Sequence, residues 1–163
     1  MTSQGAFTEE EWARLERSPI VAAMAISLAD PGGPIEAVKE SMAAIKSVSE
    51  ATQSDKQPEL VREVATSFTE KTRARQSPLK DFRPKGAMAG QMILDELRGA
   101  NEIVTRKGTP EEAAAFREWL LGVAKAASEA AKEGGFLGFK AERVSAGEKE
   151  MLDKLAEVLS APA

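Results

Sequence analysis

The feature that most constrains the fold is the spacing of apolar residues, which recur at steps of three and four along most of the chain. This is the period of an α-helix, whereas a half-buried strand requires alternation at steps of two, and no segment shows it convincingly. Turn-forming sequences such as DPGGP, QSDKQP and RQSPLKDFRPKG separate the stripes. Three hydroxyl residues are each followed three positions later by Glu, the signature of a helix start: Thr8 with Glu11, Thr109 with Glu112, and Ser145 with Glu148. The sequence therefore predicts an all-α protein.

These signals predict about seven helices, two of them short, over residues 9–17, 19–29, 35–48, 58–68, 86–104, 110–134 and 145–159. A helix is expected to restart at Pro19, because proline fits the first helical position. Its sequence, PIVAAMAISLA, is apolar nearly all round, which is typical of a buried central helix. We expect one compact multi-helix bundle spanning residues 1–163, with an internal loop at residues 76–85.

The large apolar residues on these stripes are expected to face inward. One amphipathic helix face consists of Ile35, Val38, Met42, Ile45 and Val48. The methionines on the stripes are interpreted as core filler, with a plastic binding groove as the alternative; they are Met24, Met42, Met88 and Met92. Both tryptophans, Trp12 and Trp119, are interpreted as core or interface anchors.

Several chemistries are excluded because the chain lacks the residues that perform them. There is no cysteine, which excludes disulfides, thiolate nucleophiles and cysteine-ligated metal sites. There is no histidine, which excludes Ser–His and Cys–His triads and removes the commonest metal ligand. There is also no tyrosine. A net charge of −4 disfavours non-specific binding to nucleic acid or to an anionic membrane.

The amino-terminal sequence MTSQGAFTEEEWARLERSP indicates where the protein works. It is acidic and has no basic segment followed by an apolar one, so we expect no signal peptide. The most apolar run, residues 20–29, is too short to span a bilayer. The expected location is the cytoplasm.

Two of the chain's eight aromatic residues lie in a glycine-rich segment that follows a helix, within the sequence EAAKEGGFLGFKAERVS. The favoured interpretation is a helix terminator with a hydrophobic plug, because glycine closes helices and the next apolar residue packs back onto the last turn. The alternatives are the lip of an apolar pocket, an anchor for a partner protein, or an anion-binding nest of backbone N–H groups. The candidate residues are Gly134, Gly135, Phe136, Leu137, Gly138 and Phe139.

The sequence AAFREWLLGVAKAASEAAKEGGFLGF, followed by RVSAGEKEMLDKLAEVL, resembles a group of short uncharacterised bacterial proteins. In that group an F-x-x-W-L helix leads to A-A-K-E-G-G-F-L-G and then V-S-x-x-E. The start of the chain, FTEEEWARLERSPIVAAMAISLADPGGPIEAVKES, is similar too, so the resemblance covers both ends. It implies a bacterial all-helical protein and no particular chemistry. A looser likeness to the tellurite-resistance TerB-like fold rests on helix content and acidity.

A basic run forms a second candidate site, with one aromatic residue among the cations and Asp81 as the one acid between residues 71 and 85. The favoured interpretation is a solvated helix end, where cations suit the helix dipole, followed by a proline-stiffened loop. The alternatives are a phosphate or nucleic-acid site, or a site for an acidic protein. The residues are Lys71, Arg73, Arg75, Lys80, Phe82, Arg83 and Lys85.

Three pairs of glutamates lie four residues apart, which places each pair on one helix face. They are expected to be ordinary surface charge, and the alternatives are a hard cation site or acid–base chemistry. The pairs are Glu36 with Glu40, Glu59 with Glu63, and Glu129 with Glu133. No cofactor or metal is implied.

These observations favour a non-enzymatic intracellular helical protein that acts through protein–protein contacts, as a homodimer or with another protein. The alternative is a helical carrier or sensor of an apolar small molecule, with a pocket lined by Met, Phe and Leu. An enzyme that uses only Lys, Ser and carboxylates is a third hypothesis, and no motif points to one.

Overall fold

The structure is a computed structural model that describes residues 2–30, 32–132 and 146–162. The described part is all-helical and contains no strand. Six α-helices follow one another: α1 (Glu9–Ala29), α2 (Pro34–Thr52), α3 (Glu59–Arg73), α4 (Ala89–Lys107), α5 (Pro110–Lys132) and α6 (Ala146–Val158). Two short 3₁₀ helices, η1 (Gln4–Ala6) and η2 (Gly86–Met88), precede α1 and α4.

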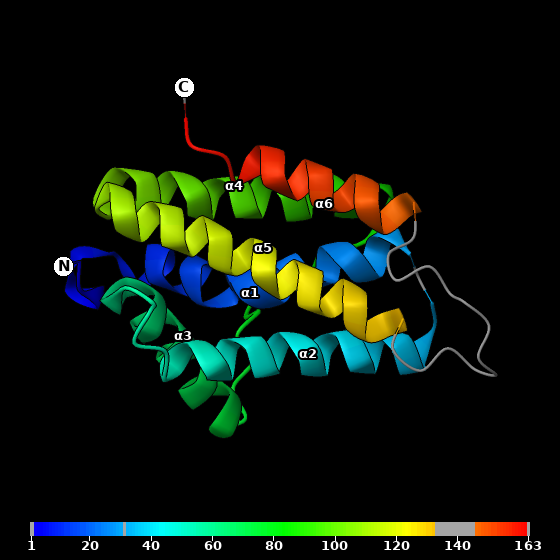
Figure 1. The fold of residues 1–163 in the computed structure, drawn as a ribbon, viewed down its shortest axis with the longest axis horizontal. Helices are drawn as coiled ribbons and strands as arrows, with labels where there is room; N and C mark the ends of the chain where they lie inside the picture. The colour runs from blue at the N-terminus through cyan, green and yellow to red at the C-terminus, as the bar shows by residue number, and fades with distance from the viewer. Residues whose placement is uncertain (1, 31, 133–145, 163) are drawn as a thin grey trace.

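Helix α1 is the centre of the bundle, as predicted for its second half. It contacts each of the other five α-helices. Figure 1 shows α1 running through the middle, with α4 and α6 along one side, α2 and α3 along the other, and α5 crossing over it. Val21, Ala22 and Ile26 are fully buried, because neighbours surround the helix on every side.

The prediction of seven helices was wrong by one, because the two segments on either side of Pro19 form a single helix. A proline inside a helix removes one backbone hydrogen bond and crowds the preceding turn. Here Pro19 is buried, and the adjacent Ser18 hydroxyl donates a 2.7 Å hydrogen bond to the Arg14 carbonyl. Packing along both halves of α1 therefore keeps the helix continuous through the proline.

The start of α1 matches the predicted capping box. The Thr8 hydroxyl accepts from the Glu11 N–H at 3.1 Å, and the Glu11 carboxylate accepts from the Thr8 N–H at 2.8 Å. The same carboxylate pairs with Lys107 at 2.5 Å and with Arg106 at 2.6 Å, both from the end of α4. Hydrogen bonds from Lys107 and from the Thr8 backbone lower the pKa of Glu11 to about 2. This charged cluster fixes the start of α1 against the end of α4.

Both tryptophans are buried, as predicted. Trp12 lies 5.5 Å from the ring centre of Phe7, and Trp119 lies 5.9 Å from that of Phe116. The four methionines differ in burial, and the prediction that they fill the core was wrong for three of them. Met24 packs partly buried against the core, whereas Met42, Met88 and Met92 are exposed. Among the described residues, no helix is long and apolar enough to cross a bilayer.

Candidate interaction surface

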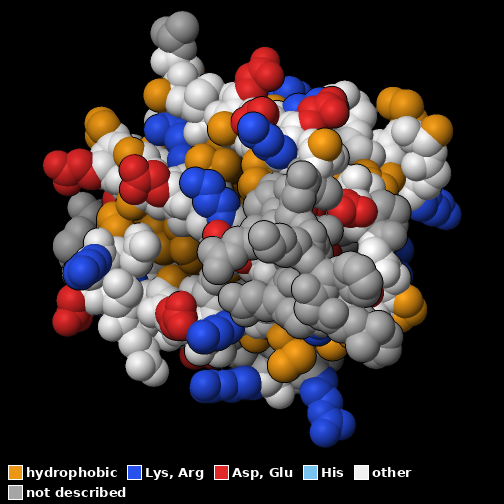
Figure 2. All heavy atoms as spheres, turned by 45° about the vertical axis from the view of Figure 1, so that its right-hand side comes forward, with side chains coloured by type: hydrophobic (Ala, Val, Ile, Leu, Met, Phe, Trp, Pro, Cys, Tyr) orange, Lys and Arg blue, Asp and Glu red, His pale blue; other side chains and the backbone are white. Residues whose placement is uncertain are grey.

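The most unusual surface is a row of large apolar side chains along α2, which we call the α2 stripe and define as Ile35, Val38, Met42 and Ile45. Their exposed fractions are 69%, 57%, 65% and 42%. Figure 2 shows a small group of hydrophobic side chains low on this face of the molecule, with Lys or Arg side chains below and beside them. The sequence predicted that these four residues and Val48 face the core. That prediction was wrong for the four residues of the stripe, whereas Val48 is buried.

A second face of α2 is buried instead, and it carries smaller residues. It consists of Glu40, Ala44, Val48 and Ala51. At 100° per residue, this face lies about 145° around the helix from the α2 stripe. Alanines let two helix backbones approach closely, and α2 packs against α5, α3 and α1. Close packing of the small face thus turns the large side chains outward.

Glu40 ties the buried face of α2 to α1. The Ser27 hydroxyl donates a hydrogen bond to the Glu40 carboxyl, which is 1% exposed. Burial raises the pKa of Glu40, and the nearby charges of Glu148, Asp30 and Glu36 add to this, against the lowering effect of the Ser27 hydrogen bond. A carboxyl held this way favours the protonated form more than it would in water.

One edge of the α2 stripe borders a cleft of about 570 Å³ between α2 and α5. Met42 and Ala43 line it on the α2 side, together with Lys39 and Lys46. Lys46 lies 3.9 Å from Glu50, an exposed pair that solvent screens strongly. The opposite edge of the stripe carries the small exposed hydroxyl group of Ser41. No charged side chain lies within the stripe itself.

The apolar surface exposed by the α2 stripe is large enough to drive association. Its four exposed fractions together exceed two whole side chains. Burying that surface is worth roughly 3.5–7 kcal/mol per copy, at about 1.5–3 kcal/mol for each aliphatic side chain. Soluble monomers rarely expose large contiguous apolar patches, and those that do usually bind something there.

The residues of the basic run do not form one free basic patch in the structure. Lys71 donates to the carboxylate of Glu16, which is 1% exposed and also accepts from the Ser67 hydroxyl. Phe82 packs partly buried against the core, and the Arg17 guanidinium lies 5.7 Å from its ring centre. The remaining members of the run are exposed: Arg73, Arg75, Lys80, Arg83 and Lys85. Neither Lys71 nor Phe82 therefore contributes to a free basic patch.

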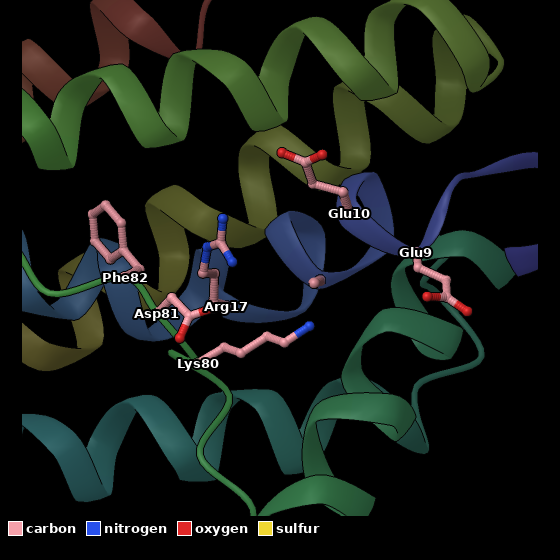
Figure 3. Close-up of a pocket in the computed structure, with 7 residues that line it drawn as sticks. Glu9, Glu10, Arg17, Lys80, Asp81 and Phe82 are labelled. Carbon is pink, nitrogen blue, oxygen red and sulfur yellow. The ribbon is translucent and has the colours of Figure 1, made fainter.

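A cleft beside this run is mixed in charge. It has a volume of about 500 Å³, and its walls include Arg17, Lys80 and three carboxylates. Figure 3 shows the carboxylates of Glu9, Glu10 and Asp81 around the same space as the two cations. A phosphate would meet more negative than positive charge there, which argues against an anion site.

The candidate loop of residues 134–139 lies outside the described residues, so its interpretation stays a prediction.

The glutamate pairs were expected to be ordinary surface charge, and that interpretation was wrong for Glu40, which is buried. Glu63 accepts a 3.0 Å hydrogen bond from the Gln4 N–H, and Glu133 lies outside the described part. Within residues 2–30, 32–132 and 146–162, no group of three or more carboxylates could hold a metal ion.

Sequence reasoning missed the exposed stripe because two apolar faces compete along α2. The signal was present, since Ala44 and Ala51 are seven residues apart and mark a second face of small residues. It also missed the buried carboxyl groups, among them Glu16, Glu40 and Glu96. Glu40 shares its helix face with Ala44 at a spacing of four, which could have indicated burial.

Comparison with known proteins adds no further constraint. No protein-family model matches the chain. No curated protein and no solved structure matches it either. The function is therefore argued from the surface of the molecule itself.

Proposed function

We propose that this is a non-enzymatic helical protein that acts through protein–protein contacts, and that the α2 stripe is its contact surface. One observation carries the proposal: four large aliphatic side chains lie exposed along one side of α2. A partner that covers them removes them from water, which is the main driving force of most protein association. The bacterial origin and cytoplasmic location expected from the sequence stay predictions.

The carrier hypothesis has less support. Ligand pockets for apolar molecules are concave and mostly apolar, with few polar groups. Five surface clefts among the described residues all include charged side chains, the cleft beside Met42 among them. Native mass spectrometry tests this alternative, since a bound molecule adds mass that denaturation removes.

Photo-crosslinking in the cell tests the contact surface. A photoreactive amino acid replaces Met42 in one variant and Met88 in the other. The two methionines are matched in type and exposure, at 65% and 62%, but Met88 lies outside the α2 stripe. Discrete adducts are expected from position 42 and not from position 88. Equal labelling from both positions, or none from position 42, contradicts the proposal.

A further inference from the structure

We infer that the partner of the α2 stripe is the α2 stripe of a second copy of this chain, so that two bundles pair through α2 about a two-fold axis. The inference rests on the proposed function and names its partner. It depends on the spacing of the stripe, on the charges beside it, and on the position of α2 in the bundle.

The spacing of the stripe suits a helix pair. Ile35, Val38, Met42 and Ile45 follow one another at steps of three, four and three. These steps match the spacing of a two-stranded coiled-coil seam over about one and a half heptads, and in such a seam each side chain inserts between side chains of the facing helix. The steps read the same in both directions, so a reversed copy presents a matching row. A two-fold interface must be complementary to itself, and this row meets that requirement.

The charges beside the stripe are compatible with self-pairing. No carboxylate or cation lies within the stripe, so closing the seam buries no unpaired charge. Lys39 and Lys46 lie at one edge, where long side chains cover apolar surface and keep the ammonium group in water. Lys46 already has Glu50 beside it at 3.9 Å. Repulsion between the lysines of the two copies is therefore weakened by Glu50 and by solvent.

The position of α2 leaves room for a second bundle. Figure 1 shows α1 and α5 above α2, and a green segment of the chain below the carboxyl-terminal part of α2 only. The stripe occupies about 15 Å of its amino-terminal half. A stable interface buries roughly 800 Å² on each partner, and the stripe with its edges forms the core of one at the small end of that range. We therefore expect a dimer with a Kd on the order of 10–100 µM.

Sedimentation velocity from about 5 to about 500 µM protein tests the inference across that Kd. The wild-type chain is expected to shift from monomer to dimer over the series. Met42→Glu places a charge in the seam and is expected to weaken dimerisation at least ~100-fold. Met88→Glu introduces the same charge at an equally exposed methionine and is expected to leave the dimer unchanged. Both variants change exposed side chains, and circular dichroism checks that each is folded.

A thiol cross-link locates the contact independently. The chain has no cysteine, so Met42→Cys carries a single reactive thiol. A short bismaleimide is expected to join two such chains, and to join far fewer Met88→Cys chains at the same concentration. Poor cross-linking of Met42→Cys in a dimeric sample places the contact elsewhere and overturns the inference.

Two further outcomes overturn it and separate it from the proposed function. A wild-type chain that stays monomeric to the highest concentration overturns the dimer, and so does a dimer that Met88→Glu dissociates while Met42→Glu does not. If the chain is monomeric and position 42 still cross-links to a different protein in the cell, the dimer fails and the contact surface stands. If it is monomeric and position 42 yields no adduct, both fail.

Discussion

Two valines on α2 test which side of the helix faces the core. Val48 is 1% exposed and Val38 is 57% exposed, so the same change to alanine should have different consequences at the two positions. Val48→Ala removes two buried carbons, worth about 0.8 kcal/mol each, and leaves a partly filled cavity. The higher helix propensity of alanine offsets this loss of stability by roughly 0.5 kcal/mol. We expect Val48→Ala to lower the free energy of unfolding by about 1–2.5 kcal/mol.

Val38→Ala should be nearly neutral, because the removed carbons were already in contact with water. The helix propensity of alanine can even raise the free energy of unfolding by up to about 0.5 kcal/mol. Urea unfolding measures both variants, with the fluorescence of the buried Trp12 and Trp119 as the signal. The protein is kept at low micromolar concentration, so that dimerisation contributes little.

A loss of stability in Val38→Ala as large as that in Val48→Ala, or larger, would refute this orientation of α2. In that case α2 is rotated, the stripe faces the core, and the proposed contact surface does not exist. A loss at Val48 alone supports the arrangement in which the small face of α2 is buried.

Three further predictions concern polar contacts, all measured by urea unfolding. The free energy of unfolding of Glu40→Gln should rise relative to that of the wild type as the pH rises from 4 to 7. The reason is that the pKa of Glu40 is raised in the folded protein, so the wild type loses stability when this carboxyl group ionises. A difference that does not change with pH would contradict this. Lys71→Met should cost about 1–3 kcal/mol, since it leaves the buried Glu16 carboxylate without its cation, and adding Glu16→Gln should recover part of that loss; a cost below about 0.5 kcal/mol would show that the pair is unimportant. Thr8→Ala should cost about 1 kcal/mol through loss of the helix cap, and an unchanged unfolding midpoint would count against that cap.

Local signals in the sequence predicted most of the helical elements. The pairs Thr8 with Glu11 and Thr109 with Glu112 start helices in the structure because a hydroxyl and a carboxylate three residues apart satisfy free N–H groups wherever the helix packs. Pro19 was misread because the same residue can open a helix or lie inside one. Burial on all sides of α1 decided between the two, and burial is not a local property.

For the candidate site, too, the sequence determined some features and the tertiary structure decided others. The sequence by itself determined that α2 is a helix with a row of large apolar side chains, since the spacing of Ile35, Val38, Met42 and Ile45 requires only the helical period. Which face of α2 is buried was decided by the tertiary structure. The free energy of close packing against α1 and α5 depends on the shapes of three helices together, and small residues such as Ala44 and Ala51 let them approach. The lysine pairing of Glu16 was also decided there, because it joins residues 55 positions apart.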